Sequence, residues 1–306
     1  MRRTTSLMWA TGRVTLDAIS VDSSAANMRA RPVAASAHSS SCRLLRCSAL
    51  RSYSSATYPS TTGSATPGAP FDRPFHLILN LAIGGRLLDV TRWDRKNYFY
   101  PDLPKGYQIS QYDLPLASMG RLVVDTSDGP FEVTITRAHL EEDTAKLVHA
   151  TSPGGRKVSL VDFNRSGAPL MEIVTDPDIR TAEQARRYAE ELQLLMRTIG
   201  ASDADMERGQ MRVEANVSLR PRDTEPFGTR VEVKNMNSFR SVERAIQFEI
   251  ARQAAALDAG EPLRQETRGW ADDRGETYHM RSKETSDDYR YFPEPDLPPL
   301  HVNAQG

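Results

Sequence analysis

The sequence has few cysteines and no long apolar run. Both of its cysteines, Cys42 and Cys47, lie within the first 70 residues. The rest of the chain therefore has no disulfide, no cysteine-ligated zinc and no cysteine nucleophile. No apolar run approaches the ~20 residues that a membrane-spanning helix needs, so we expect no membrane span. The missing thiols are consistent with a reducing compartment.

Acidic residues are scarce at the start of the chain and abundant after it. The first 70 residues contain eight arginines, no lysine and two acids, Asp17 and Asp22, which gives them a charge of +6. The whole chain of 306 residues has a net charge of −1, so residues 71–306 have a charge of −7. A body this acidic is not a general nucleic-acid binder, and any contact with RNA must be local or come from a partner.

Residues 1–70 are rich in Ser, Ala and Arg. Such a composition cannot bury a core, so we expect this segment to be disordered. An Arg-rich, Ser-rich and acid-poor segment is also typical of an organelle transit peptide, which predicts localisation to the mitochondrial matrix. A plain disordered tail, or mistranslated upstream sequence, remains the alternative. Residues 71–306 would then form the folded body.

The body contains alternating strand and helix signals. Val133 and Ile135 alternate with threonines, which predicts a strand. Thr181 and Gln184 form a capping box that begins a helix, and Gly200 ends it. The expected strands are 122–125, 131–138, 158–163, 170–174, 211–219, 230–234, 265–268 and 278–281, with helices at 77–83, 181–199 and 238–259. Gly154-Gly155-Arg156-Lys157 is expected to be a hairpin tip, since it lacks the spacing of a phosphate-binding loop.

Two groups of carboxylates interrupt these strands. Glu141, Glu142 and Asp143 are consecutive at a strand end, where they repel one another unless a cation or base is nearby. They form either a solvated acidic turn or a magnesium site, because hard cations prefer carboxylate oxygens. Glu172 lies in the middle of an apolar strand, so it either faces solvent or is a ligand.

The alternation of residues 211–219 predicts a strand with one apolar and one ionic face. Arg212, Glu214 and Asn216 share the ionic face, and Arg230 and Lys234 follow on the next predicted strand. The two strands are expected to pair antiparallel. The ionic face is either the outer face of a half-buried sheet or a site that holds a metal, a nucleotide and a second substrate.

An unusual run of aromatics, prolines and lysines spans residues 96–113. Pro101 and Pro104 fix the backbone and remove two donors, so an ordered loop is expected. Tyrosine rings and lysine charges could line a wet, charged site, or the loop could simply be fastened to the core by its aromatics.

This loop resembles the hallmark loop of the B subunit of the aspartyl/glutamyl-tRNA(Asn/Gln) amidotransferases. Three further stretches carry the same resemblance. The match runs from about residue 93 to residue 300, and the four motifs follow one another along it in the order that the family has. The three further stretches are 139–146 (HLEEDTAK), 164–175 (NRSGAPLMEIVT), and 281–284 (RSKE) continuing to 287–296 (DDYRYFPEPD). The resemblance implies an α+β fold, an antiparallel sheet backed by helices in a cradle domain related to glutamine synthetase.

The resemblance also implies a reaction. ATP would phosphorylate the side-chain carboxylate of Glu or Asp misattached to tRNA, and ammonia would displace the phosphate. The partners would be an amidase, the A subunit of the complex, which makes ammonia from glutamine, a small third subunit in a heterotrimer, and the misacylated tRNA. The body shows no amidase signature of its own.

Site roles follow from the resemblance residue by residue. Mg²⁺ would bind Glu141 and Glu172, with Glu142 and Glu214 close by. ATP or the tRNA terminus would be held by Arg212, Asn216, Arg230, Lys234 and Lys283. The loop would border the ammonia path and the acceptor end through Lys96, Tyr98, Tyr100, Lys105, Tyr107, Gln108 and Gln111.

The sequence departs from the family pattern in several places. A Gly-Leu-Glu-Val-His-type strand and a zinc-binding cysteine cluster are not found in residues 1–92, and Glu214 replaces the more usual Asp. The helical and tail domains that follow in the family are also not found, so we expect a cradle incomplete at both ends. A non-catalytic scaffold for the amidase is the alternative, and a free-standing ligase for small carboxylates is a third, weaker one.

Overall fold

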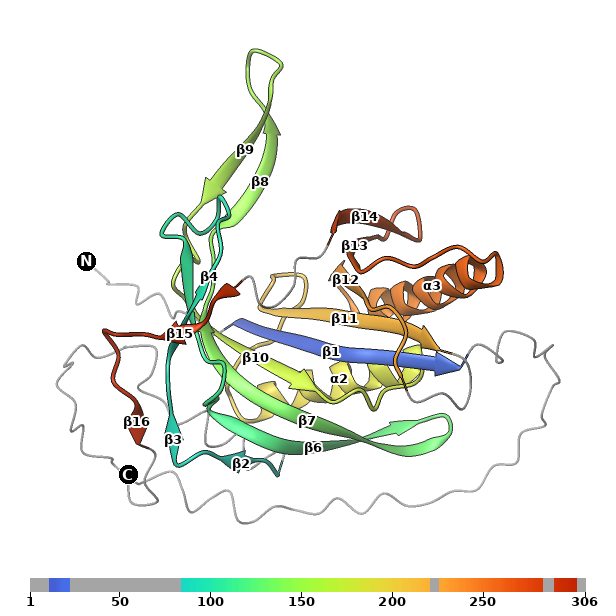
Figure 1. Cartoon of the computed structure of the whole chain (residues 1–306), viewed down its shortest axis with the longest axis horizontal. Helices are drawn as coiled ribbons and strands as arrows, with labels where there is room; N and C mark the ends of the chain where they lie inside the picture. Colours follow the sequence, from blue (N-terminus) through green and yellow to red (C-terminus); the bar gives the residue numbers. More distant parts are fainter. Residues whose placement is uncertain (1–10, 23–83, 221–225, 283–288, 302–306) are drawn as a thin grey trace, which may run out of the picture.

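The computed structural model describes residues 11–22, 84–220, 226–282 and 289–301. Within these ranges nine strands form one mixed sheet, and two long helices pack on one of its faces (Figure 1). The mixed α+β fold that the sequence predicts is therefore confirmed. Across the sheet the strand order is β14 (Glu276–Ser282), β13 (Glu266–Ala271), β12 (Val231–Met236), β11 (Met211–Arg220), β1 (Thr11–Asp22), β10 (Pro169–Thr175), β7 (Gly129–Glu142), β6 (Ala117–Thr126) and β2 (Arg86–Leu87).

Strand β1 occupies the middle of the sheet and is parallel to both neighbours, β10 and β11. The expectation of disorder is therefore wrong for residues 11–22, and the rest of residues 1–70 lies outside the described ranges. Strands β12 and β13 are also parallel, so the sheet is not purely antiparallel. In the sequence, apolar Val14 and Leu16 flank a polar residue, as do Ile19 and Val21. A register shift separates these two pairs along the strand. Averaging composition over 70 residues hid this interrupted strand pattern.

Helices α2 (Ala182–Thr198) and α3 (Phe239–Asp258) begin and end close to the predicted positions. The capping box of α2 is confirmed, since the Thr181 hydroxyl accepts from the backbone N–H of Gln184 at 3.1 Å while the Gln184 side chain accepts from that of Thr181. The Ser238 side chain caps α3. Both helices pack on the apolar face of the sheet and bury a continuous stripe, which includes Tyr188, Leu192, Met196, Val242 and Ile246. This packing leaves the opposite, polar face for the site.

The polar face of β11 is not solvated. The predicted antiparallel pairing of β11 with β12 is confirmed, and Val213, Ala215 and Val217 enter the core. Glu214 and Asn216 on the other face are nevertheless also buried. Alternation thus predicted which side chains share a face, whereas the burial of the polar face depends on segments that pack there from elsewhere.

Part of the predicted aromatic loop is strand. Strands β4 (Asp94–Asn97) and β5 (Tyr107–Ser110) pair antiparallel, and the turn between them and residues 111–113 are loop. The end of the described chain returns to this region, where β15 (Phe292–Pro293) pairs with β4 and β16 (Leu300–His301) pairs with β3 (Val90–Thr91). Segments about 200 residues apart therefore pair in two small sheets beside the main sheet (Figure 1).

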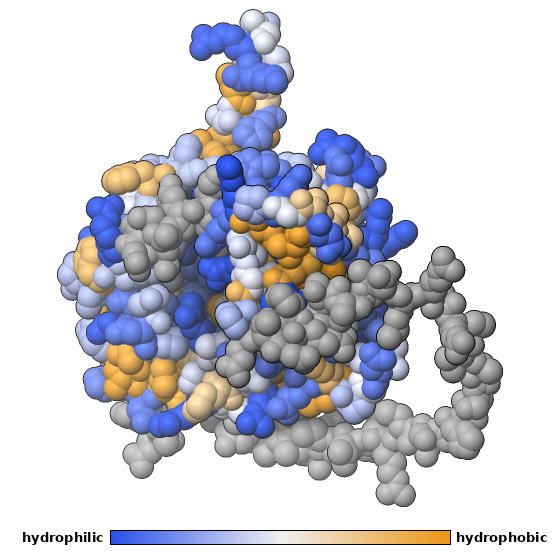
Figure 2. All heavy atoms as spheres, turned by 45° about the vertical axis from the view of Figure 1, so that its right-hand side comes forward, coloured by the Kyte–Doolittle hydropathy of each residue, from blue (hydrophilic) through white to orange (hydrophobic). Residues whose placement is uncertain are grey.

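Strands β8 (Lys146–Thr151) and β9 (Lys157–Asp162) form a separate hairpin that projects from the body (Figures 1 and 2). Its tip contains Gly155 at a φ of 77°, which confirms the predicted turn.

The predicted helix at 77–83 lies outside the described residues. No helix in the described parts of the chain is long and apolar enough to cross a membrane.

Candidate active site

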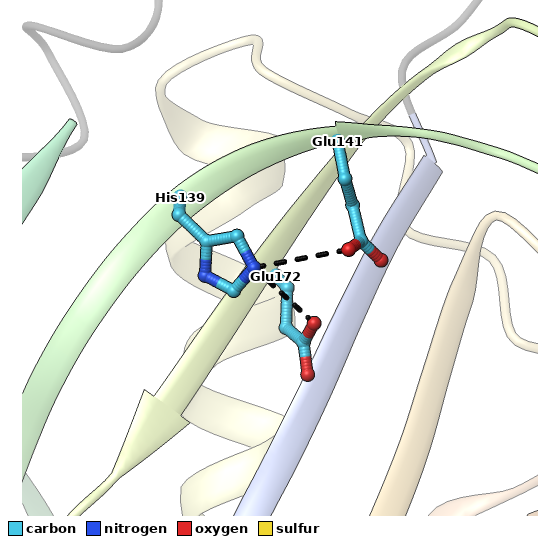
Figure 3. A group of neighbouring side chains, drawn as sticks. All are labelled: His139, Glu141 and Glu172. Carbon is cyan, nitrogen blue, oxygen red and sulfur yellow. Dashed lines mark ion pairs between the residues drawn. The ribbon is translucent and has the colours of Figure 1, made fainter. Parts of the chain in front are cut away.

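A histidine and two glutamates meet on the polar face of the sheet. His139 and Glu141 are two residues apart on β7, so they share a face, and Glu172 on β10 lies directly opposite His139 in the strand register. The Nε2 atom of His139 is 3.4 Å from Glu172 Oε2 and 3.8 Å from Glu141 Oε2 (Figure 3). The prediction that Glu141 and Glu172 lie together is therefore met by the geometry.

His139 and Glu141 of this cluster are buried, and Glu172 is partly buried. His139 and Glu141 are each 3% exposed, and the Ser110 hydroxyl donates to Glu141 Oε2 at 3.2 Å. Burial alone would lower the pKa of His139. Hydrogen bonds to Glu141 and Glu172 outweigh that effect, so the pKa lies above its ordinary value. The two carboxylates thus favour a positive charge at the point where they meet.

The donor atoms suit a divalent cation. One ligand atom from each of His139, Glu141 and Glu172 lies within 4.8 Å of the other two. Carboxylate oxygens are the ligands that Mg²⁺ prefers, and imidazole nitrogen is acceptable to several divalent metals. The prediction missed His139, although the two-residue period of a strand already places it on the same face as Glu141.

Ion pairs continue the polar face across the sheet. Arg212 on β11 donates to Asp143 Oδ2 at 2.9 Å, and Lys234 on β12 lies 3.2 Å from Glu214 Oε2. Asp143, the last of the three consecutive carboxylates, is buried just after β7 and pairs with Arg212, so it is not part of a solvated turn. These pairs place Arg212, Glu214 and Lys234 beside one another, as the alternation of β11 predicts.

A cavity of about 1030 Å³ opens between the aromatic turn, the end of the described chain and strands β12 to β14. Five of the predicted site residues line it: Lys96, Tyr98, Tyr100, Gln108 and Lys234. Asp143 of the carboxylate run also lines it, together with residues that were assigned no role from the sequence: Asn97, Phe99, Asp102, Thr144, Thr267, Met280, Arg281, Tyr289 and Arg290. Tyr289 and Arg290 belong to the DDYRYFPEPD motif, residues 287–296.

Tyr291 connects the cavity with the His139 cluster. Its ring stacks on Tyr112 at 4.3 Å between centroids and lies edge-on to Tyr289, which lines the cavity. Burial raises the pKa of the Tyr291 hydroxyl to about 12, with smaller effects from Lys96, Glu141 and Glu172. Gln108 on β5 lines the cavity, and Ser110 two residues further along the same strand donates to Glu141, so the cavity adjoins the cluster.

Several predicted loop residues support the site from outside the cavity. The carboxylate of Glu142 accepts from the backbone N–H of Ile109 at 2.9 Å and pairs with Lys105, so it holds β5 against β7. Gln111 is buried, where it donates to Thr91 and accepts from the Leu140 backbone. The contacts of Glu142 and Gln111 fix the loop on the sheet. They do not place the Glu142 or the Gln111 side chain in the His139 cluster.

Three other predictions stand apart from the site. Arg230 is exposed at the start of β12, several residues along the strand from Lys234, and does not line the cavity. Asn216 is buried further along β11. Tyr107 lies under the cations Arg95 and Lys105, at 4.3 and 4.7 Å. Lys283 lies outside the described residues.

Comparison with known proteins gives the family. Residues 74–306 match the family model of the GatB/GatE catalytic domain, so the chain belongs to this family. It is 52% identical over 235 residues to the B subunit of the aspartyl/glutamyl-tRNA(Asn/Gln) amidotransferase of Gloeothece citriformis, a match that covers 74% of this chain and 48% of that protein. The protein of the same name from Moorella thermoacetica is 52% identical over 230 residues, with 75% and 48% covered.

The matched region contains all the residues of the candidate site. The chain spans about half the length of the curated relatives that it matches. Family membership therefore applies to the catalytic domain, residues 74–306.

Proposed function

We propose that the chain is the ATP-dependent transferase subunit of a glutamine-dependent tRNA amidotransferase. It would transfer the γ-phosphoryl group of ATP to the side-chain carboxylate of Glu on tRNA(Gln), or of Asp on tRNA(Asn), releasing ADP. Ammonia would then attack the acyl carbon and expel phosphate, leaving the amide. The observation that carries this proposal is the His139–Glu141–Glu172 cluster, of which His139 and Glu141 are buried, beside a large, cation-lined cavity.

The residues of the site suit phosphoryl transfer, which depends on positioning and charge neutralisation. Glu141 and Glu172, with His139, would hold Mg²⁺, which would offset phosphate charge when bound. Lys96, Lys234 and Arg281 line the cavity and would attract the phosphates of ATP. No step requires a nucleophile from this chain, because the substrate carboxylate attacks and ammonia comes from elsewhere.

The proposed partners follow from the same reaction. The amidase, as the A subunit, would supply ammonia, and a small third subunit would complete a heterotrimer. The Arg-rich composition of residues 1–70 supports a mitochondrial role, in the matrix, where misacylated Glu-tRNA(Gln) would be the substrate. A cradle related to that of glutamine synthetase would fit, since that enzyme also makes an amide through an acyl phosphate.

The test is amidation by the assembled complex with and without the cluster. Glu172→Gln removes one negative ligand while keeping the side-chain volume, so ATP-dependent amidation should fall about 100-fold or more while the partner's glutaminase persists. Glu276→Gln removes an exposed glutamate that pairs with Arg274 and should leave amidation unchanged. Full amidation by the Glu172 variant would reject the assignment. A wild-type complex with glutaminase but no amidation would indicate a non-catalytic scaffold.

A further inference from the structure

The hairpin of β8 and β9 projects from the body and carries apolar side chains along one face (Figures 1 and 2). In its register Val148 lies opposite Leu160, and Ala150 lies opposite Val158. Because residues two apart on a strand share a face, these four aliphatic side chains form one contiguous surface, the apolar face of the hairpin. Val148 is 39% exposed and Leu160 is 55% exposed, and no further strand of the described ranges pairs with the hairpin.

Toward the tip, the opposite face of the hairpin is polar. His149 lies across from Ser159, with 3.0 Å between His149 Nδ1 and Ser159 Oγ, and Thr151 lies across from Lys157. The hairpin is therefore amphipathic, like a pair of strands that rests on a core. A two-stranded hairpin is at best marginally stable in water by itself, so covering its apolar face would stabilise it.

The hairpin begins at the cavity of the candidate site. Asp143 and Thr144 line the cavity, and β8 begins two residues later, at Lys146. After β9, the Arg165 guanidinium donates to the Thr144 carbonyl at 3.0 Å and lies 3.7 Å from Asp143. Both ends of the hairpin are thus fastened beside the cavity, and a partner that binds the hairpin would lie there too.

The charge of the hairpin restricts what can cover it. Residues 146–162 contain three cations, Lys146, Arg156 and Lys157, against one acid, Asp162, which gives a charge of +2 where residues 71–306 as a whole have −7. All three cations are exposed. The complementary surface is an apolar groove with an acidic rim. Aliphatic side chains offer RNA neither a stacking ring nor a hydrogen bond, so a protein groove fits this face better than RNA does.

We propose that the apolar face of the hairpin docks into an apolar groove with an acidic rim on the amidase partner. The inference rests on the proposed function, which introduces the amidase, and it names the surface through which this chain binds it. The place of the hairpin suits that partner, because ammonia released far from the cavity would be lost to solvent before it met the activated substrate.

The experiment measures the affinity of the full chain for the purified amidase subunit by titration calorimetry. Val148→Thr combined with Leu160→Thr makes the face polar while keeping residues that favour strands, so the dissociation constant should rise about tenfold or more. Val123→Thr is the matched control, because Val123 lies on β6 and is also 55% exposed, and its affinity should equal that of wild type. Arg156→Glu combined with Lys157→Glu should weaken binding as well, and added salt should reduce that effect.

Hydrogen exchange of the wild-type chain tests the same surface without a variant that could unfold the hairpin. Backbone amides of β8 and β9 should exchange quickly in the free chain and about tenfold more slowly, or slower still, once the amidase is bound. Unchanged exchange in β8 and β9 would overturn the proposal. Equal affinity of wild type and the Val148→Thr, Leu160→Thr variant for the amidase would overturn it too.

Two other outcomes would assign the hairpin to a different occupant and so overturn the proposal. One is normal amidase binding by the double threonine variant together with a loss of tRNA binding, and the other is a change only in self-association of the chain. ATP-dependent amidation by the wild-type complex tests the proposed function separately. A complex that assembles through the hairpin but does not amidate tRNA would keep the docking surface and reject the proposed function.

Discussion

Glu249 and Glu141 are both buried, but they are held in opposite ways. Glu249 on α3 is fully buried and accepts hydrogen bonds from Arg252 at 2.6 and 3.0 Å, from Gln253 at 2.9 Å and from Thr277 at 3.1 Å. Glu141 on β7 lies instead beside a second carboxylate, that of Glu172, with His139 between them. The contacts of Glu249 join α3 to β14. Those of Glu141 bring three possible metal-ligand atoms close together.

The comparison shows that burial of a carboxylate does not by itself identify a functional site. Donors that satisfy a carboxylate fix a fold, because the group has no capacity left for a ligand. Acceptors that converge raise the cost of the folded state until a proton or a cation joins them. The identity of the neighbours, rather than the depth of burial, therefore distinguishes the structural glutamate from the candidate ligand.

The largest expected effect is the loss of folding stability when Glu249, the carboxylate surrounded by donors, is removed. Glu249→Ala would leave the guanidinium of Arg252 and the Thr277 hydroxyl without their partner, so the free energy of unfolding should fall by about 3–5 kcal/mol. Urea unfolding of the chain measures this difference. Glu276→Ala, which removes an exposed carboxylate paired with Arg274, should change it by less than about 0.5 kcal/mol. A similar, small loss in both variants would show that the Glu249 network is not structural.

The next largest expected effect is stabilisation of the folded chain by Mg²⁺, which tests whether Glu141 and Glu172 bind a cation. If Mg²⁺ binds the folded cluster and not the unfolded chain, as proposed, then Mg²⁺ at about 100 times its dissociation constant should stabilise the folded chain by about 2.7 kcal/mol. Thermal unfolding with and without Mg²⁺ measures this, in the absence of ATP or partners. Glu172→Gln should lose most of the shift and Glu276→Gln should keep it. An equal shift in wild type and Glu172→Gln would place the cation elsewhere.

Local patterns predicted the scaffold well. The capping box at Thr181 and the alternation of β11 depend on neighbours in sequence, so helix α2 and the polar face of the sheet were accessible from the chain alone. The pairing of Glu141 with Glu172 was reached through the resemblance. The two-residue period of a strand would also have placed His139 on the same face as Glu141.

The remainder of the site depends on contacts between distant segments. Tyr289, Arg290 and Tyr291 join the aromatic turn only after the chain has crossed the whole sheet, and no local signal marks that return. The burial of Glu214 is likewise set by what packs on the polar face. Strand β1 was missed because its pattern is broken by a register shift inside a segment whose average composition predicts disorder.

The smallest effect concerns a third carboxylate, Glu294, which is held by one cation. Arg95 donates to its two oxygens at 2.6 and 2.8 Å and thereby fastens β15 to β4. The hydrogen bonds from Arg95 lower the pKa of Glu294 below its ordinary value of 4.5, against a smaller opposing effect of burial. A lowered pKa in the folded state means that the pair contributes stability above pH 4.5 and that this contribution is lost as the pH falls through the folded pKa.

Glu294→Gln should therefore be less stable than wild type at neutral pH, and the difference should shrink as the solution becomes more acidic. Urea unfolding of both chains across a pH series measures that convergence. Glu276→Gln, for which no such convergence is expected, gives the baseline slope. A difference between wild type and Glu294→Gln that stays constant with pH would mean that Glu294 acts through the shape of its side chain. In that case the charge of Arg95 would not be what fastens β15 to β4.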